Sequence, residues 1–232
     1  ISYTFPPSTA STSGTISISS GSLTGDATGT ITVNGGTQSY LKVRDQSGGG
    51  GNEVGDVTIT TDETLDLFAA VYDADENYLQ DLSVDWSSSG NLDAVSVSGS
   101  SFTFSPTTSS TSGAISISSG SLTGDVTGTI TVNVGAQAYL IIRDQSGGGG
   151  NEVGDVTMTT DESLTLYAAV YDVDDNYLQD LSVDWVSSGD LDAVSASGTS
   201  FTFSPTTGPT SGQIWITSGS LISDVTGTIT VN

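Results

Sequence analysis

The 232-residue sequence contains no cysteine and no histidine, and its three lysine and arginine residues stand against 27 aspartate and glutamate residues. The absence of cysteine excludes disulfide bonds and thiolate metal sites. Without histidine or cysteine, a serine hydroxyl lacks its usual activating base, which disfavours nucleophilic catalysis. The formal net charge of −24 repels the phosphates of nucleic acids and anionic membrane surfaces. We therefore expect neither an enzyme nor a nucleic-acid-binding protein, and no insertion into a membrane.

Long apolar segments are also missing. No run approaches the roughly 20 apolar residues that a membrane-spanning helix requires, and no signal peptide precedes the strand pattern at residues 1–7. We expect a mature segment or part of a longer protein. Apolar residues make up only 34% of the chain, but they alternate with polar residues between glycine- and serine-rich turns, which is typical of folded β-structure.

The sequence repeats itself with a period of 99 residues, so that Tyr40 recurs as Tyr139. Residues 1–34 match only the last third of a repeat. The predicted organisation is therefore an incomplete repeat at 1–34, consisting of C-terminal strands only, followed by complete domains at 35–133 and 134–232.

Each full repeat consists of short segments with strand periodicity and none with helical periodicity. Residues 64–72 alternate in the manner of a half-buried strand, and residues 82–86 do the same as far as Trp86. Evenly spaced short strands predict a β-sandwich or barrel, and a tryptophan near the end of a middle strand favours an immunoglobulin-like sandwich. The strands expected in the first full repeat are 40–44, 57–60, 64–72, 82–86, 94–97, 101–104, 114–118 and 129–132.

Five segments of the first full repeat carry a resemblance to a known family: Tyr40–Val43, Leu67–Asp73, Val84–Ser88, Ser96–Gly99 and Gly128–Val132. Together they resemble the bacterial immunoglobulin-like domains of group 2, which occur in invasin- and adhesin-type surface proteins and as appendages of secreted enzymes. The resemblance implies an all-β fold of tandem immunoglobulin-like β-sandwiches in a linear array, located outside the cell or on its surface. In that family such domains are mostly spacers.

The strands of residues 1–34 are too few to bury a core alone. Their apolar residues Ile16, Ile18, Ile31 and Val33 therefore need a covering layer. We expect these residues to form an interface at which a neighbouring copy, or chain preceding residue 1, completes the sandwich by strand pairing. Copies would then associate head-to-tail. The alternative is an incomplete, frayed end.

The loop that follows residue 72 carries oxygen-bearing side chains at a spacing suited to calcium. Asp73, Asp75, Asn77 and Asp81 occupy the first, third, fifth and ninth positions of an EF-hand-like loop, although its glycine and final glutamate are missing. We expect a looser calcium site with a Kd on the order of 10⁻⁴–10⁻³ M. The alternative is a solvated acidic loop. The equivalent residues of the second full repeat are Asp172, Asp174, Asn176 and Asp180.

A glycine-rich insertion offers a second candidate calcium site, because four consecutive glycines let backbone carbonyls approach an ion closely. Its side-chain ligands would be Asp45, Asn52, Glu53 and Asp56. A flexible loop without a ligand is the alternative. For the neighbouring Arg44 we expect a bidentate ion pair with a nearby carboxylate. The equivalent candidate ligands of the second full repeat are Asp144, Asn151, Glu152 and Asp155.

Apolar residues replace polar ones at several positions of the second full repeat that are expected to face outward. These residues are Ile141, Val186, Trp215 and Ile222, which stand where the first full repeat has Lys42, Ser87, Ser116 and Thr123. An exposed tryptophan on a strand normally packs against another surface. We expect a contact patch between subunits or domains; the alternative is a platform on which a sugar stacks.

Together these features predict a structural extracellular protein that forms the shaft of a filament, a pilus-like fibre or an adhesin stalk. Its copies would assemble head-to-tail and be stiffened by calcium. The alternative is an adhesin module that binds carbohydrate or another surface, and a domain appended to a secreted hydrolase comes third. Glycosidase-type carboxylate pairs are not excluded by composition, but a site duplicated in tandem without an aromatic cleft argues against catalysis.

Overall fold

A computed structural model describes residues 2–232, which form 26 β-strands and no helix. Within this range there is accordingly no helix that could span a membrane. The strands group into two compact units. Unit 1 consists of Ile1–Ile59, Glu63–Pro106 and Thr111–Val132, and unit 2 consists of Thr60–Asp62, Thr107–Ser110 and Asn133–Asn232.

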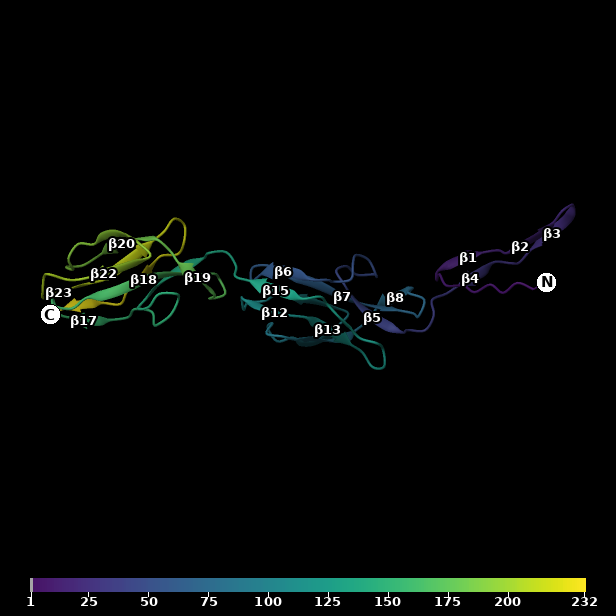
Figure 1. Cartoon of the computed structure of the whole chain (residues 1–232), viewed down its shortest axis with the longest axis horizontal. Coiled ribbons are helices and arrows are strands. Elements are labelled where there is room, and N and C mark those ends of the chain that lie inside the picture. Colours follow the sequence, from purple (N-terminus) through teal and green to yellow (C-terminus); the bar gives the residue numbers. More distant parts are fainter. Residues whose placement is uncertain (1) are drawn as a thin grey trace. The chain divides into compact units, whose positions relative to one another are not determined.

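Unit 1 begins with four short strands, β1 (Thr12–Gly14), β2 (Ser17–Ser20), β3 (Leu23–Ala27) and β4 (Ile31–Val33). β1 pairs antiparallel with β4, and β2 with β3. We call β1–β4 the N-terminal ribbon; it is the two-stranded segment drawn in purple in Figure 1. A ribbon of two strands has no second layer against which to bury its apolar side chains.

The first full repeat continues with a sheet in the order β11-β7-β5, in which β8 pairs with the C-terminal half of β7. All these pairs are antiparallel. The inward-facing residues of β5 and β7 are buried, as their alternation predicts. The strands are β5 (Tyr40–Arg44), β7 (Leu65–Tyr72), β8 (Tyr78–Asp81) and β11 (Ser101–Phe104).

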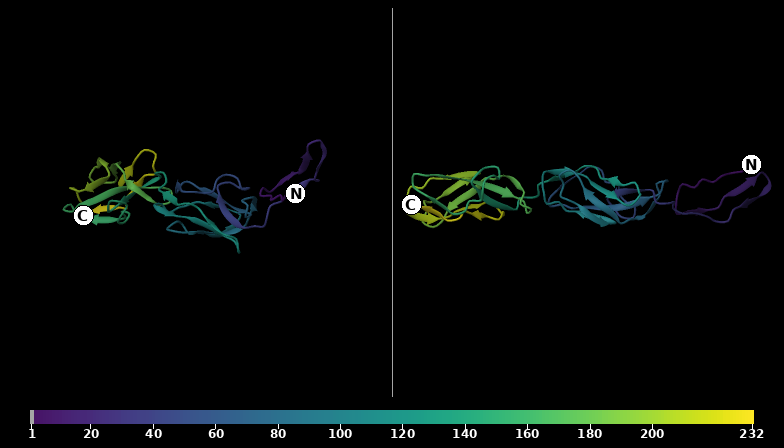
Figure 2. Two further views of the ribbon diagram at one scale, coloured as in Figure 1. Left: turned by 45° about the vertical axis from the view of Figure 1, so that its right-hand side comes forward. Right: turned by 90° about the horizontal axis from the view of Figure 1, so that it is seen from below.

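The facing layer consists of a four-stranded sheet in the order β10-β9-β13-β14 and a separate three-stranded sheet in the order β12-β15-β6. Figure 2 shows the two layers. Two sheets that pack face to face with this strand order form an immunoglobulin-like β-sandwich. The strands are β6 (Val57–Thr60), β9 (Val84–Ser88), β10 (Ser96–Gly99), β12 (Thr111–Gly113), β13 (Ile115–Ser118), β14 (Asp125–Val126) and β15 (Ile130–Asn133).

Trp86 lies at the centre of the apolar core of this sandwich, with 1% of its surface exposed. Its indole N–H donates to the carbonyl of Gly99 at 2.9 Å, so the one polar atom of the ring is satisfied. Its ring lies 5.9 Å from that of Phe102, measured between centroids. The core cluster contains no residue before Leu41, and the N-terminal ribbon therefore contributes nothing to it.

Unit 2 contains a second sandwich with the same pairing. One layer is a sheet that joins β16, β18 and β19, with β22 also paired to β18. The other layer consists of two sheets, in the orders β21-β20-β24-β25 and β17-β26-β23. β17 runs parallel to β26. The protein is thus an all-β chain of tandem immunoglobulin-like sandwiches. The strands are β16 (Tyr139–Arg143), β17 (Val156–Met158), β18 (Leu164–Tyr171), β19 (Tyr177–Asp180), β20 (Val183–Ser187), β21 (Ser195–Gly198), β22 (Ser200–Phe203), β23 (Thr210–Gly212), β24 (Ile214–Thr217), β25 (Asp224–Val225) and β26 (Ile229–Val231).

The structure differs from the expected strands in three respects. β8, β12 and β14 were not expected, and β9 and β10 lie two residues further along than predicted. The C-terminal half of β7 is buried on both faces, because Tyr40 and Tyr78 pack against the ring of Tyr72. The half-buried pattern expected for the whole strand therefore holds only in its first half.

Candidate functional site

Asp73, the first residue of the predicted calcium loop, follows β7 and has only 2% of its surface exposed. Its Oδ1 accepts hydrogen bonds from the backbone N–H groups of Asp75 (3.0 Å) and Asn77 (2.9 Å), and its Oδ2 accepts one from Gly36 (2.8 Å). These donors favour the charged carboxylate and lower the pKa of Asp73, with the Gly36 N–H contributing most. The loop is closed around this single carboxylate.

Asp172 repeats this arrangement in unit 2 and is completely buried. Its Oδ1 accepts from the N–H groups of Asp174 (3.0 Å) and Asn176 (2.8 Å). Its Oδ2 accepts from the N–H of Gly135 (3.0 Å) and the hydroxyl of Thr61 (2.9 Å). Burial by itself raises the pKa of Asp172, but these hydrogen bonds outweigh it and the net shift is downward.

Asn77 joins this loop to a distant segment of the chain. Its Nδ2 donates to both carboxylate oxygens of Asp73, at 3.1 and 3.0 Å, and to the carbonyl of Ser8 at 3.0 Å. Its Oδ1 accepts from the N–H of Ala10 at 2.9 Å. One carboxamide thus binds the backbone carbonyl of Ser8 and the backbone N–H of Ala10, two residues later.

Asn176 makes the same two bonds in unit 2. Its Nδ2 donates to the carbonyl of Thr107 at 2.9 Å, and its Oδ1 accepts from the N–H of Ser109 at 3.0 Å. Thr107 and Ser109 stand 99 positions after the residues that Asn77 holds. We call this pair of bonds the asparagine contact; this role was not anticipated from the sequence, in which both asparagines read as calcium ligands.

The aspartates that head the two predicted calcium loops do not fit a bound cation in this arrangement. Each carboxylate already faces several N–H groups, whose hydrogens occupy the directions from which an ion would bind. No group of three or more acidic side chains that could hold a metal occurs between residues 2 and 232. The geometry thus disfavours an ion at these two aspartates, while calcium binding itself stays a prediction.

The other members of these loops lie further out. Asp75 is exposed, and Asp174 is half-buried. Asp81 accepts from the N–H of Gly48 at 2.9 Å and from the hydroxyl of Tyr78 at 3.1 Å. Asp180 makes the equivalent bonds in the second repeat. These aspartates join the loop to the glycine-rich insertion instead of converging on one point.

Arg44 donates hydrogen bonds to the backbone carbonyls of the glycine-rich insertion. Its Nη2 donates to the carbonyls of Gly49 (3.0 Å) and Gly51 (2.8 Å), and its Nε donates to that of Gly50 (3.1 Å). The ion pair expected between Arg44 and a carboxylate is wrong, because the backbone carbonyls take its place. The glycine carbonyls that were predicted to approach a calcium ion thus accept hydrogen bonds from a guanidinium group.

The remaining two basic residues behave differently from Arg44. Lys42 forms an ion pair with Glu53, with a nitrogen–oxygen distance of 3.2 Å. Arg143, the equivalent of Arg44, donates to the carbonyl of Gly150 at 3.3 Å, and its guanidinium carbon lies 5.4 Å from the centroid of the Tyr171 ring.

The aspartates of the insertion each accept a hydrogen bond from a different backbone N–H group. Asp45 accepts from the N–H of Asn52 at 2.7 Å, and Asp56 accepts from that of Thr129 at 2.7 Å. Gly51 has a φ of +63°, and a Cβ at this position would lie 1.7 Å from Oδ1 of Asp45, so the turn requires glycine. In the second repeat Asp144 pairs with Asn151 and Asp155 with Thr228, and Glu152 is exposed.

The N-terminal ribbon exposes apolar side chains that are buried in the full repeats. Ile18 is 71% exposed, whereas its equivalents Ile117 and Ile216 are 3% and 0% exposed. Phe5 is 46% exposed, against 2% for its equivalent Phe104. The covering layer expected over the ribbon is therefore not supplied by the described chain.

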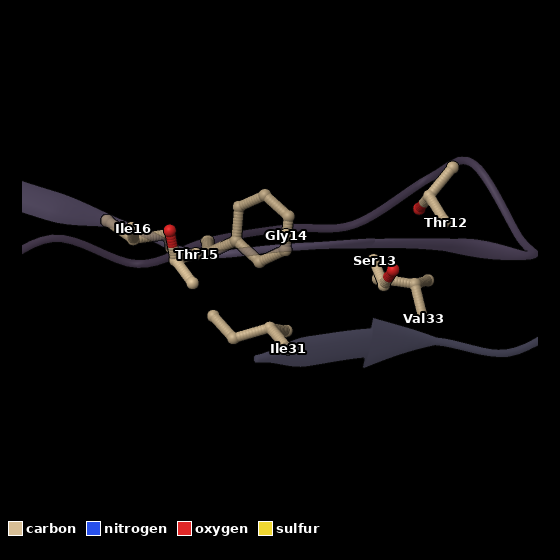
Figure 3. A pocket seen from close by; sticks show the side chains of 8 residues that line it. Thr12, Ser13, Gly14, Thr15, Ile16, Ile31 and Val33 are labelled. Carbon is tan, nitrogen blue, oxygen red and sulfur yellow. The ribbon is translucent and has the colours of Figure 1, made fainter. Parts of the chain in front are cut away.

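A shallow hollow of about 200 Å³ lies along this ribbon. Ile16, Ile31 and Val33 line it together with Phe5 and the polar residues of β1. Figure 3 shows the side chains of Ile31 and Val33 projecting from β4 into the hollow. The three aliphatic residues are half-buried, and Ile18 is not among the residues that line the hollow.

Trp215 and Val186 form an exposed apolar pair on the second sandwich. They are direct partners on β24 and β20, and they are 41% and 49% exposed. Their equivalents Ser116 and Ser87 are joined by a hydrogen bond of 2.9 Å between hydroxyls. Of the other residues predicted for this patch, Ile222 is 70% exposed and forms a bridge with Tyr139, and Ile141 is half-buried on β16 of the other sheet.

No family model and no curated protein matches this sequence. Among solved structures, the N-terminal four Ig domains of Dscam1 isoform 6.9 match with a TM-score of 0.35 and 10% identity, over 87% of this chain and 48% of that one. Domains 3–5 of the extracellular part of Drosophila OTK match with a TM-score of 0.36 and 11% identity, over 84% of this chain and 67% of that one. The chain spans about half the length of the Dscam1 structures. Similarity at this level has no bearing on what the chain binds or does.

Proposed function

We propose that this chain is a structural repeat protein of the cell exterior, which forms part of the shaft of a filament or adhesin stalk and is related to the bacterial immunoglobulin-like domains of group 2. The observation that carries the proposal is the asparagine contact, which occurs twice at equivalent positions. A load-bearing array requires hydrogen-bonded contacts that recur at the equivalent positions of successive repeats.

The asparagine contact depends on the backbone of the bound segment and hardly on its side chains. It uses a carbonyl and an N–H, and it accepts Ala10 in one case and Ser109 in the other. The buried aspartate beside it holds the carboxamide in place through two further bonds. Such a contact can be copied from repeat to repeat without further changes in sequence.

Amide hydrogen exchange tests the contact directly. In the intact protein the N–H groups of Ala10 and Ser109 should exchange slowly, and Asn77→Ala and Asn176→Ala should each accelerate only their own partner. Asn151→Ala, which alters an exposed asparagine, is the matched control. Rapid exchange at both amides in the unaltered protein would remove the main support for a stiff array.

Self-association is the second part of the proposal. The N-terminal ribbon needs a layer with the pattern of β5 and β7, because residues of these two strands share one core cluster with the equivalents of the ribbon's apolar residues. Both full repeats have closed cores, so a neighbouring copy can donate such strands only by opening one of its own sandwiches or from chain outside these repeats. Electron micrographs of the purified protein distinguish fibres, which support head-to-tail assembly, from dispersed particles, which oppose it.

A binding module remains the alternative, and the Trp215–Val186 pair favours it. An exposed indole beside an aliphatic residue suits the apolar face of a sugar ring. Quenching or a blue shift of tryptophan fluorescence on addition of a polysaccharide, lost in Trp215→Ser, supports this function. Ile141, Val186, Trp215 and Ile222 as a subunit interface would instead give concentration-dependent assembly without any sugar.

A further inference from the structure

The end of the second repeat that lies opposite its asparagine contact has a set of exposed polar groups. They belong to four residues, each 99 positions after a residue that takes part in the contacts within unit 2. We call this set the terminal surface; its members are Thr160, Asp161, Thr206 and Gly208, equivalent to Thr61, Asp62, Thr107 and Ser109.

The four equivalent residues show what such a set can bind. Within unit 2 the Thr61 hydroxyl donates to the carboxylate of Asp172 at 2.9 Å. The carboxylate of Asp62 accepts from the N–H of Ala136 at 2.6 Å. Thr107 and Ser109 supply the carbonyl and the N–H of the asparagine contact. Together these bonds engage one loop of the Asp-x-Asp-x-Asn type and the segment just before its first strand.

Exposure differs in two of the four pairs, whereas Asp62 and Thr107 are as exposed as Asp161 and Thr206. Thr61 is 8% exposed and its hydroxyl is bonded, whereas Thr160 is exposed. Ser109 is half-buried, whereas Gly208 is exposed. The strands around the two sets have the same pairing, and the two less exposed residues, Thr61 and Ser109, are the ones that are hydrogen-bonded to the loop of the second repeat.

The terminal surface is held in shape by bonds of its own. The carboxylate of Asp192 accepts from both the N–H and the hydroxyl of Thr206, at 2.6 and 2.8 Å. The carboxylate of Glu162 accepts from the N–H of Thr159 at 2.7 Å. A surface that is ordered before binding loses less conformational entropy when a partner arrives.

We propose that the terminal surface is a docking site for another immunoglobulin-like repeat that carries the Asp-x-Asp-x-Asn loop. The buried aspartate of that repeat would accept from Thr160 Oγ1, and its asparagine would bind the Thr206 carbonyl and the Gly208 N–H. The Asp161 carboxylate would accept a backbone N–H near the first strand of the partner. The proposal rests on the proposed function, since it uses the asparagine contact as its template.

The chemistry of the terminal surface selects this partner over a cation or a polyanion. It presents one hydroxyl donor, one N–H donor, one carbonyl and one carboxylate, which match a carboxylate, a carboxamide and a backbone N–H. Both sides are acidic, so the proposed contact should strengthen with added salt as the repulsion between the two acidic surfaces is screened.

The test fuses a further copy of residues 134–232 after Asn232, in register with the 99-residue period. The probe is amide hydrogen exchange at Gly208, compared between the fused protein and the 232-residue chain. We expect exchange at Gly208 to slow by at least about tenfold in the fusion. Replacing the added copy's equivalent of Asn176 by alanine should restore rapid exchange, and Thr160→Val should accelerate it partly.

Ser109 serves as the internal reference in both proteins. Protection of Ser109 with rapid exchange at Gly208 in the fusion overturns the docking proposal and leaves the proposed function standing. Rapid exchange at both amides overturns both. Protection of Gly208 that survives loss of the added asparagine also overturns the docking proposal, because another contact would then be its cause.

Discussion

The carboxamide nitrogen of Asn176 donates to both carboxylate oxygens of Asp172, at 3.1 and 3.0 Å, while the oxygen of the same carboxamide accepts from Ser109. The asparagine thereby satisfies a buried charge and binds a backbone segment at once. Neither task can be removed without affecting the other.

Asn176→Ala should therefore reduce the free energy of unfolding by about 1–3 kcal/mol, because it leaves a buried carboxylate short of donors and the Ser109 N–H without its acceptor. Urea denaturation measures the change. Asn151→Ala removes an exposed carboxamide and should change stability by less than about 0.5 kcal/mol. Equal effects of the two substitutions would contradict the role assigned to Asn176.

Acid should destabilise the protein through its buried aspartates. The Gly36 N–H and its neighbours lower the pKa of Asp73, and the hydrogen bonds around Asp172 outweigh burial and lower its pKa too. A carboxyl whose pKa is lower when folded stabilises the protein above its unfolded pKa of about 4, and this contribution is lost as pH falls through the folded value. Urea midpoints measured from pH 7 to pH 2 should stay level and then drop below pH 4, and Asp172→Asn should flatten that drop. A midpoint that does not depend on pH in this range would rule the mechanism out.

Calcium offers a direct comparison between sequence and structure. Because Asp73 and Asp172 are already bonded to N–H groups, we expect millimolar calcium and a chelator to give melting temperatures within about 1 °C of each other, with magnesium as the control for screening of charge. A calcium-specific rise of several degrees that is lost in Asp75→Asn and Asp174→Asn would instead support the calcium sites predicted from the sequence.

The ribbon and the full repeats provide a matched pair of isoleucines. Ile117→Ser should destabilise the monomer by about 2–5 kcal/mol, because it places a hydroxyl in a packed core. Ile18→Ser should change monomer stability by less than about 0.5 kcal/mol, since the side chain is 71% exposed. If ribbons mediate assembly, Ile18→Ser should nevertheless reduce sedimentation of oligomers, and an unchanged oligomer distribution would place the interface elsewhere.

Trp215→Ser combined with Val186→Ser recreates the serine pair of the first repeat. The double variant should keep its melting temperature within about 2 °C, because both side chains are substantially exposed. Analytical ultracentrifugation should show weaker self-association if the pair is a contact. Trp185→Ala, which empties the core beside it, should by contrast lower stability by about 3–5 kcal/mol.

The sandwich was predictable because its core depends on alternation, which the first half of β7 and the residues of β9 up to Trp86 follow. β8 was not predictable, since Tyr78–Asp81 lies at the end of the predicted calcium loop and becomes a strand only by pairing with β7. Periodicity records which face of a strand is buried, and it carries no information on pairing at a sheet edge.

The calcium sites expected from the sequence stay predictions, because the sequence pattern does not identify what binds the carboxylates. An aspartate followed at even spacing by oxygen-bearing residues has the same pattern whether its partners are an ion or backbone N–H groups. The decisive donors of Gly36 and Gly135 lie 37 positions away in sequence. The sequence signal that could have identified the asparagine contact was the recurrence of Asn77 as Asn176 near an equally repeated aspartate, although most other residues recur between the two full repeats as well.

The guanidinium group of Arg44, surrounded by three glycine carbonyls, has one further consequence. This positive charge belongs to a side chain and is covalently attached to the loop. A chelator cannot remove this positive charge, and a change in salt concentration cannot replace it with another ion. A loop held by a bound metal ion would change its conformation with the concentration of that ion. The loop held by Arg44 should keep its conformation at every ion concentration.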